Sequence, residues 1–293
     1  MSPIPIDLDG ILQECIQISQ EAGALTLSVF SRDLSSKGLS YKQPDHPVTE
    51  ADRLSHRHIV ERLEALTPSI PVISEESESH ILPDDCRMFW LVDPLDGTKE
   101  FIKGSGEYTV NIALVNDGVP LLGVIDVPVF HLTYYGGHSC GFGVFRNTPD
   151  DRGRNIHSSP QDDHHEARKK GPPYIVSISQ SHRSSEDERL LSRISEEVEV
   201  IQDYCGSSLK FCRVAEGRSH FYVRLGATME WDTAAGQAIV MSAGGKVMDW
   251  SLTSLRYNKK NFRNPGLIVA DGNSPELDAM WKRLSRDFKH CSE

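Results

Sequence analysis

Residues 108–127 contain two apolar runs joined by a short turn signal. One run extends from Tyr108 to Val115 and the other from Val119 to Val127, with Asn116-Asp117-Gly118 between them. Apolar runs rich in β-branched residues favour strands, and Asn, Asp and Gly are typical of tight hairpin turns. The segment therefore predicts a strand, a turn and a second strand, which belong to an antiparallel sheet.

Helical spacing of apolar residues occurs on the N-terminal side of this hairpin. A stripe at helical spacing runs from Leu8 to Ala22 after the cap candidate Asp7, which predicts a first helix with one buried stripe. The segment Thr49-Glu50-Ala51-Asp52 resembles a capping box. A second helix is therefore expected to begin at Thr49 and to end before Pro68.

The C-terminal half mixes strands and helices as well. The pattern predicts a strand over residues 174–179 and helices over residues 185–197, 207–216 and 233–243. The segment 146–173 is polar and lacks periodicity, so it is expected to be a surface loop. A subdomain boundary is expected after this loop, which divides the chain into residues 1–173 and 174–293. The mixture of elements predicts an α+β and α/β protein.

Composition excludes several classes of protein. A net charge of −11 does not suit a partner of nucleic acid polymers, because such binding requires a basic face. Six cysteines are scattered without CxxC pairs, which argues against a zinc module. The sequence shows no transmembrane segment of about 20 apolar residues and no secretory signal. We therefore expect a cytoplasmic protein with a small-molecule ligand, and a small anionic substrate is compatible with this charge.

Two aspartates follow the apolar run Phe89-Trp90-Leu91-Val92 in the segment Asp93-Pro94-Leu95-Asp96-Gly97-Thr98. Such a turn at a strand end can present two carboxylates and the Leu95 carbonyl to cations. The amides of Gly97 and Thr98 can point at an anion, because glycine lets the backbone approach a ligand. Taken alone, the segment is equally consistent with an ordinary Asp-rich turn.

Three further segments carry carboxylates, and each also has a structural interpretation. Glu75 and Glu76 follow another apolar run and could be solvated loop charges. Asp232 precedes a predicted helix and could be its N-cap, and Asp52 could only close its capping box. If these acids converge, the ligand set is all oxygen, which selects Mg²⁺ or Mn²⁺ over zinc. Two or three such ions can bridge a phosphate and lower the pKa of a bound water.

Four ordered segments together resemble the inositol monophosphatase-like, lithium-sensitive phosphatases. They are Pro47-Val48-Thr49-Glu50-Ala51-Asp52, Ile73-Ser74-Glu75-Glu76-Ser77, Asp93-Pro94-Leu95-Asp96-Gly97-Thr98 and Trp231-Asp232-Thr233-Ala234-Ala235-Gly236. The resemblance covers nearly the whole chain. It implies a five-layer α-β-α-β-α sandwich of the inositol monophosphatase/fructose-1,6-bisphosphatase type, with an active site between the two halves.

Other segments resemble the CysQ-type branch of this superfamily, the 3'(2'),5'-bisphosphate nucleotidases. They are Thr98-Lys99-Glu100-Phe101-Ile102, Ser181-His182, residues 206–211, residues 222–226 and residues 264–266. The inositol enzymes typically carry DGTTNF at the first of these positions. The resemblance implies hydrolysis of 3'-phosphoadenosine 5'-phosphate to AMP and phosphate by a metal-activated water, as in sulfur assimilation. Activity on the sulfated analogue is also compatible with it.

The resemblance also implies roles for individual residues. The metal ligands would be Glu75, Asp93, the Leu95 carbonyl, Asp96 and Asp232. They would hold two or three Mg²⁺ ions, for which Mn²⁺ can substitute. Asp52 and Thr98 would orient and deprotonate the attacking water, and Gly97 and Thr98 would cradle the scissile phosphate. Further substrate contacts would come from His182, Ser207, Lys210 and Arg224, although a solvated charge is an equally good interpretation of the cations.

Two alternative functions stay open. One is an inositol-phosphate phosphatase of the same superfamily, which the Lys99-Glu100-Phe101 extension disfavours. The other is a catalytically silent protein that binds a phosphate ligand, which the intact set of acids disfavours. The choice between monomer and homodimer is open, and so is peripheral contact with the inner membrane.

Overall fold

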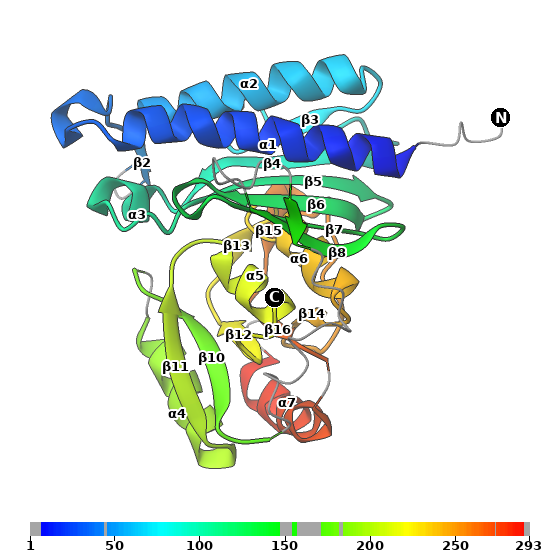
Figure 1. Ribbon diagram of the computed structural model, residues 1–293. Helices are drawn as coiled ribbons and strands as arrows, with labels where there is room; N and C mark the ends of the chain where they lie inside the picture. The colour runs from blue at the N-terminus through cyan, green and yellow to red at the C-terminus, as the bar shows by residue number, and fades with distance from the viewer. Residues whose placement is uncertain are drawn as a thin grey trace.

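In a computed structural model of the protein, layers of helices alternate with two sheets to give five layers (Figure 1). The structure describes residues 7–43, 46–146, 154–156, 171–181, 184–272 and 274–289. The α-helices are α1 (Leu8–Phe30), α2 (Glu50–Leu66), α3 (Thr98–Lys103), α4 (Ser185–Glu197), α5 (Leu209–Ala215), α6 (Ala234–Ser242) and α7 (Pro275–Phe288).

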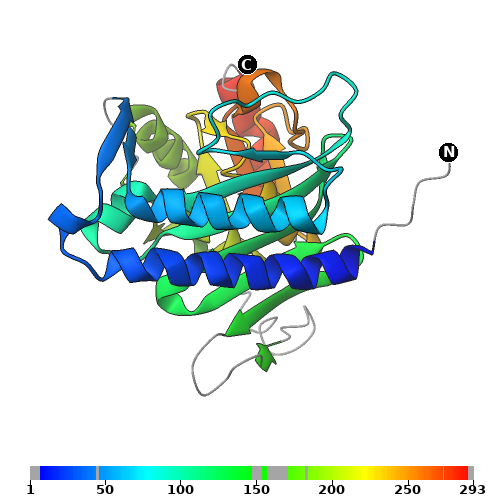
Figure 2. The ribbon, with the colours of Figure 1, turned by 90° about the horizontal axis from the view of Figure 1, so that it is seen from above.

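Helices α1 and α2 form the first layer and lie side by side across one face of a sheet (Figure 2). The Asp7 carboxylate accepts a hydrogen bond from the Gly10 amide at 3.1 Å and caps α1. Thr49 caps α2, and Asp52 completes the predicted capping box. Both expected helix starts are confirmed, because each depends on a local side-chain cap that the sequence specifies.

The second layer is a larger sheet with strand order β3-β4-β5-β6-β7-β8-β9. Its strands are β3 (Val72–Ser74), β4 (Met88–Asp96), β5 (Thr109–Asn116), β6 (Val119–Val127), β7 (Leu132–Gly137), β8 (Gly141–Arg146) and β9 (Arg154–Ile156). Strands β5 and β6 pair antiparallel, which confirms the predicted hairpin. The expected loop over 146–173 is wrong at residues 154–156, because β9 pairs with β8 there. Three residues are too few for a period-2 pattern to show in the sequence.

The sequence suggested that strand β4 ends at Val92, but the strand is longer. It continues to Asp96, and the pairing with β5 shifts register between Asp93, opposite Asn111, and Asp96, opposite Thr109. The extra residue makes a bulge, and Pro94 within it has no amide to give to a ladder. The two aspartates therefore flank an irregularity inside a strand rather than follow the strand end.

Helices α5 and α6 form the middle layer and contact both sheets. Helix α6 packs closely against the larger sheet, because Gly123 and Gly136 of the sheet face the backbone of the helix. A Cβ on Gly123 would lie 2.5 Å from the Ala235 carbonyl oxygen, and one on Gly136 would lie 2.6 Å from the Ile239 Cα. Glycine is required where a helix approaches a strand this closely.

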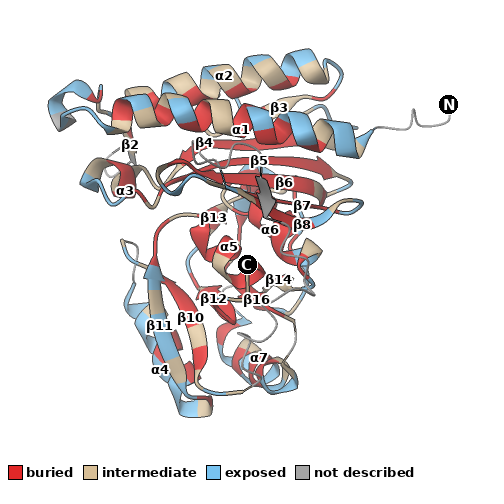
Figure 3. Cartoon of the chain, in the orientation of Figure 1, coloured by how far each residue is buried: buried red, intermediate tan, exposed pale blue. Residues whose placement is uncertain are grey.

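The fourth layer is a smaller sheet with strand order β11-β10-β12-β16-β14. Its strands are β10 (Tyr174–Ser179), β11 (Val200–Cys205), β12 (Phe221–Arg224), β14 (Lys246–Asp249) and β16 (Leu267–Ala270). Helices α4 and α7 cover its outer face through a core that includes Ile194, Phe221 and Trp281. Figure 3 shows that burial is concentrated in the two sheets and the helices between them.

The remaining elements are short. They are β1 (Ser40–Gln43), β2 (His46–Val48), β13 (Thr228–Met229), β15 (Arg263–Asn264) and the 3-10 turns Leu34–Ser36, Pro128–Phe130 and Lys260–Phe262. None of the described helices is both long and apolar enough to cross a membrane. The expected five-layer sandwich is confirmed. The subdomain boundary between residues 173 and 174 stays a prediction.

Candidate active site

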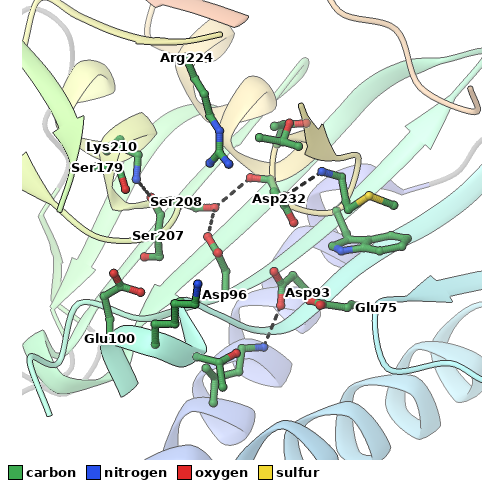
Figure 4. A pocket seen from close by; sticks show the side chains of 18 of the residues that line it. Glu75, Asp93, Asp96, Glu100, Ser179, Ser207, Ser208, Lys210, Arg224 and Asp232 are labelled. Atoms are coloured by element: carbon green, nitrogen blue, oxygen red, sulfur yellow. Dashed lines mark hydrogen bonds between the residues drawn. The ribbon is translucent and has the colours of Figure 1, made fainter. Parts of the chain in front are cut away.

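A cavity of about 690 Å³ opens between the two halves of the chain. It brings together most of the residues that the sequence singled out, from segments far apart in the chain (Figure 4). The predicted residues that line it are Glu75, Asp93, Leu95, Asp96, Gly97, Thr98, Ser207, Lys210, Arg224 and Asp232. Asp52 does not line it, and His182 lies outside the described residues.

Asp93 is the most deeply buried carboxylate of this cavity. Its Oδ1 accepts a hydrogen bond from the Leu95 amide at 3.0 Å across the bulge of β4. Burial raises the pKa of Asp93 well above its usual range, and the charges of Glu75, Asp96 and Asp232 raise it further. A carboxylate in this position needs either a proton or a nearby cation.

Asp232 comes from the C-terminal half of the chain, just before α6. Its Oδ2 accepts a hydrogen bond from the Met229 amide at 2.8 Å, and the N-cap of α6 is Thr233. The interpretation of Asp232 as an N-cap is therefore wrong. Burial and then the charge of Asp96 raise the pKa of Asp232 to about 7, against a lowering effect of Arg224 and Lys210.

A serine that the sequence did not single out connects the two halves of the chain at this cavity. Ser208 Oγ lies 2.7 Å from Asp96 Oδ2 and 2.9 Å from the Asp232 carbonyl oxygen, and its single hydroxyl hydrogen is shared between these two acceptors. It accepts a hydrogen bond from Asn111 Nδ2 at 2.9 Å. Ser208 thus fixes Asp96 of one sheet against the segment that carries Asp232.

Asp52 lies in the first turn of α2 and is not among the residues that line the cavity. Its Oδ2 accepts hydrogen bonds from the Thr49 amide at 2.7 Å and the Thr49 hydroxyl at 2.6 Å. Burial is the main reason that its pKa rises to about 6, and the charge of Glu76 adds to this. Asp52 therefore closes the capping box of α2, as its structural interpretation predicted.

The carboxylates suit a hard divalent cation by their chemistry. Glu75, Asp93, Asp96 and Asp232 supply oxygen only, as Mg²⁺ prefers, and the charges of the other three act on Asp93. Within the described ranges, no three His, Cys, Asp or Glu side chains lie close enough together, as they stand, to hold a metal ion. The donor set therefore fits Mg²⁺ by ligand type, and the number of ions stays a prediction.

Cationic side chains lie on the far side of the cavity from Glu75 (Figure 4). Lys210 Nζ donates to the Ser207 carbonyl at 2.6 Å and lies 5.2 Å from the centre of the Tyr222 ring. Ser207 has a φ of 46°, and its buried hydroxyl has no hydrogen-bond partner among the described residues. An unpaired hydroxyl on a strained backbone is typical of a ligand contact.

Several cavity residues were missed by the sequence analysis as site residues. They are Pro47, Val48, Lys99, Glu100, Ser179, Ser208, Phe211, Tyr222, Ala227, Thr228, Met229, Trp231, Thr233 and Arg263. Most belong to the segments that carry the resemblance to the phosphatase family. A single sequence does not show which side chains of such a segment face a cavity.

Comparison with known proteins gives a consistent result. The inositol monophosphatase family model matches residues 7–286. The 3'(2'),5'-bisphosphate nucleotidase CysQ of Salmonella typhimurium is 40% identical over 269 residues, which cover 88% of this chain and 99% of the relative. The CysQ of Escherichia coli K12 is 38% identical over 268 residues, with 89% and 99% coverage.

A solved structure agrees with these relatives. CysQ from Bacteroides thetaiotaomicron, described as a bacterial member of the inositol monophosphatase family, superposes with a TM-score of 0.77 at 35% identity. The superposition covers 90% of this chain and 98% of that one. The family model spans both sheets and all the segments that meet at the cavity, and the chain therefore belongs to the inositol monophosphatase family.

Proposed function

We propose that this protein is a Mg²⁺-dependent 3'(2'),5'-bisphosphate nucleotidase that hydrolyses 3'-phosphoadenosine 5'-phosphate to AMP and phosphate. The observation that carries the proposal is the division of one cavity into an acidic wall and a cationic wall. The acidic wall comprises Glu75, Asp93, Asp96 and Asp232, and the cationic wall comprises Lys210 and Arg224 (Figure 4). The charged residues Lys99, Glu100 and Arg263 also line the cavity. A substrate with two separated phosphates suits this division. An inositol monophosphate has only one phosphate for the two walls.

The acidic wall is where hydrolysis would take place. Glu75, Asp93, the Leu95 carbonyl, Asp96 and Asp232 would hold two or three Mg²⁺ ions, with Mn²⁺ as a substitute. When bound, Mg²⁺ supplies positive charge next to the phosphate and makes water more acidic. The backbone amides of Gly97 and Thr98 would hold the scissile phosphate at the start of α3.

Water activation would depend on Thr98 and Asp52. Thr98 lines the cavity and Asp52 does not, so Asp52 would act on the water through the Thr98 hydroxyl. Its raised pKa, about 6, suits a group that accepts a proton near neutral pH. Thr49 holds the Asp52 carboxylate in one orientation through two hydrogen bonds.

The cationic wall would bind the second phosphate. Arg224 and Lys210 both act on Asp232 electrostatically, which places their charges within range of the acidic wall. Ser207 would add its unpaired hydroxyl, and His182 is kept as a proposed contact. The cytoplasmic location and the choice between monomer and homodimer stay predictions.

A phosphate-release assay tests the proposal. The purified protein would be offered 3'-phosphoadenosine 5'-phosphate, its sulfated analogue and inositol 1-phosphate, with Mg²⁺ varied and Li⁺ added. We expect the highest kcat/KM for the nucleotide bisphosphate, no turnover without a divalent cation and inhibition by Li⁺. A preference for inositol 1-phosphate would support the inositol-phosphate phosphatase instead. A protein inert with every ester would support the silent phosphate-binding protein.

A further inference from the structure

Glu100 is a largely buried residue whose carboxylate has no partner among the described residues. Its side chain belongs to the first turn of α3, lines the cavity and is only 3% exposed. Among the described residues, neither of its carboxylate oxygens has a hydrogen-bond or ion-pair partner. The carboxylate oxygens are not among the fully buried side-chain atoms that lack a partner, so they open toward the cavity, and an ionised carboxylate can only accept hydrogen bonds there. The missing partner is therefore a donor that enters the cavity from outside.

The position of Glu100 indicates which part of a substrate it would meet. A Cβ placed on Gly97 would lie 3.3 Å from Glu100 Oε2 and 3.1 Å from the Cβ of Ser207. The carboxylate thus borders the segment proposed to hold the scissile phosphate. In Figure 4 it lies on the side of Ser207 and away from Glu75 and Asp93. The substrate group at this place is the one next to the phosphate.

A second glutamate close by provides a contrast. Glu107 Oε2 accepts a hydrogen bond from the Gly206 amide at 3.0 Å, and its Oε1 lies 3.7 Å from Arg213 Nη2. Glu107 therefore has its partners within the chain and needs none from a ligand. Glu100 contacts the same segment, since a Cβ on Gly206 would lie 2.7 Å from its Cγ. The two carboxylates differ in that Glu100 lines the cavity and Glu107 does not.

We infer that Glu100 accepts a hydrogen bond from the hydroxyl vicinal to the scissile phosphate. This would be the ribose 2'-hydroxyl of a 3'-phosphate, or the 3'-hydroxyl of a 2'-phosphate. The inference rests on the proposed function and names a specificity-determining residue for it. One acceptor beside the phosphate serves both isomers, because each presents a hydroxyl on the neighbouring carbon. The negative charge also disfavours a second phosphate at that carbon.

Paired substrates test this role. kcat/KM would be measured for adenosine 3',5'-bisphosphate and for 2'-deoxyadenosine 3',5'-bisphosphate, with wild type, Glu100→Ala, Glu100→Gln and the control Glu107→Gln. A hydrogen bond to a charged group predicts that wild type prefers the ribose substrate by about 10-fold to 100-fold. Glu100→Ala should reduce the preference to about 1, and Glu100→Gln, which keeps a neutral acceptor, should leave it below about 10-fold. Glu107→Gln should keep the wild-type preference.

The ratio of two substrates separates this inference from other failures. The fraction of correctly folded protein cancels in it, so a poorly folding variant still gives a valid result. A wild-type protein inert with the ribose substrate would refute the proposed function itself. A wild-type protein that is active but indifferent to the 2'-hydroxyl would overturn only the inference. A Glu100→Ala variant with the wild-type preference would do the same.

Discussion

The hydroxyl of Ser208 donates to Asp96 Oδ2 at 2.7 Å and so joins the residue before α5 to the last residue of β4. The same hydroxyl contacts the Asp232 carbonyl, and it accepts from Asn111 on β5. Three segments of the cavity wall therefore depend on one side chain. Outer partners of this kind orient metal-binding carboxylates.

Removal of this hydroxyl should weaken both activity and Mg²⁺ binding. In Ser208→Ala, Asp96 loses a donor and Asn111 Nδ2 loses its acceptor, so we expect kcat/KM to fall and half-saturating Mg²⁺ to rise by about 10-fold to 100-fold. Mg²⁺ titrations of activity and of thermal stability would measure this. Ser242→Ala is a matched control, because Ser242 bonds the carbonyls of Ala238 and Gly137 outside the cavity. An unchanged Mg²⁺ requirement in Ser208→Ala would refute the positioning role.

Neutralisation of Asp93 should have opposite effects on activity and stability. Asp93→Asn removes a buried charge that Glu75, Asp96 and Asp232 oppose. Turnover should nearly disappear, by about a thousandfold or more, because several kcal/mol of charge stabilisation depend on the ligand set. Without Mg²⁺ the variant should melt at a higher temperature than wild type, and added Mg²⁺ should no longer raise its Tm.

Two readouts check the Asp93 prediction. Phosphate release gives the turnover, and thermal melts in EDTA and in excess Mg²⁺ give the stability. Asp117→Asn on the turn between β5 and β6 should change neither, since Asp117 is half exposed and pairs with Arg87. Wild-type phosphate release by Asp93→Asn would show that the metal assignment is wrong.

The two glycines that flank α3 should respond differently to alanine. Both have positive φ, 91° at Gly97 and 77° at Gly104. A Cβ at Gly97 would also crowd Ser207 and Glu100, whereas one at Gly104 meets nothing within 4 Å. Each substitution should lower the free energy of unfolding by about 1 kcal/mol or more through backbone strain. Only Gly97→Ala should also lower kcat, as paired denaturant titrations and assays would show.

Asp126 should make stability depend on pH. It is buried between α1 and the larger sheet, and burial raises its pKa to about 7 although Thr133 donates to it at 2.7 Å. The folded state therefore binds a proton that the unfolded state has lost above about pH 4. The free energy of unfolding should fall between about pH 4 and pH 7, by an amount on the order of a few kcal/mol.

Asp126→Asn isolates this contribution. The amide keeps an acceptor for Thr133 but cannot ionise, so the variant should gain stability relative to wild type as the pH rises from 5 to 8. Denaturant midpoints at the two pH values measure the gain, and Asp117→Asn provides an exposed control. A stability difference that is the same at both pH values would mean that Asp126 does not titrate in this range.

The sequence predicted what depends on local patterns. The hairpin of β5 and β6 and the cap of α2 follow from residues adjacent in the chain, and the structure has both. The bulge in β4 was not predictable, because the register is set by the partner strand β5. The part played by Ser208 was hidden for the same reason, since its partners Asp96 and Asn111 are 112 and 97 residues away. Ordered motifs selected the acids, whereas only the fold shows which of them share a cavity.

The middle layer of α5 and α6 has a consequence for biosynthesis. Asp93 and Asp96 come from the larger sheet, and Asp232 comes from the segment just before α6, which is synthesised more than 130 residues later. Helix α6 itself packs against Gly123 and Gly136 of the larger sheet. A nascent chain that has completed only the larger sheet therefore contains Glu75, Asp93 and Asp96, but the cavity that these acids line is not yet formed. If phosphate release needs all of these acids, as proposed, it would begin only after the segment that carries Asp232 has docked, and a product truncated before this segment would be inert.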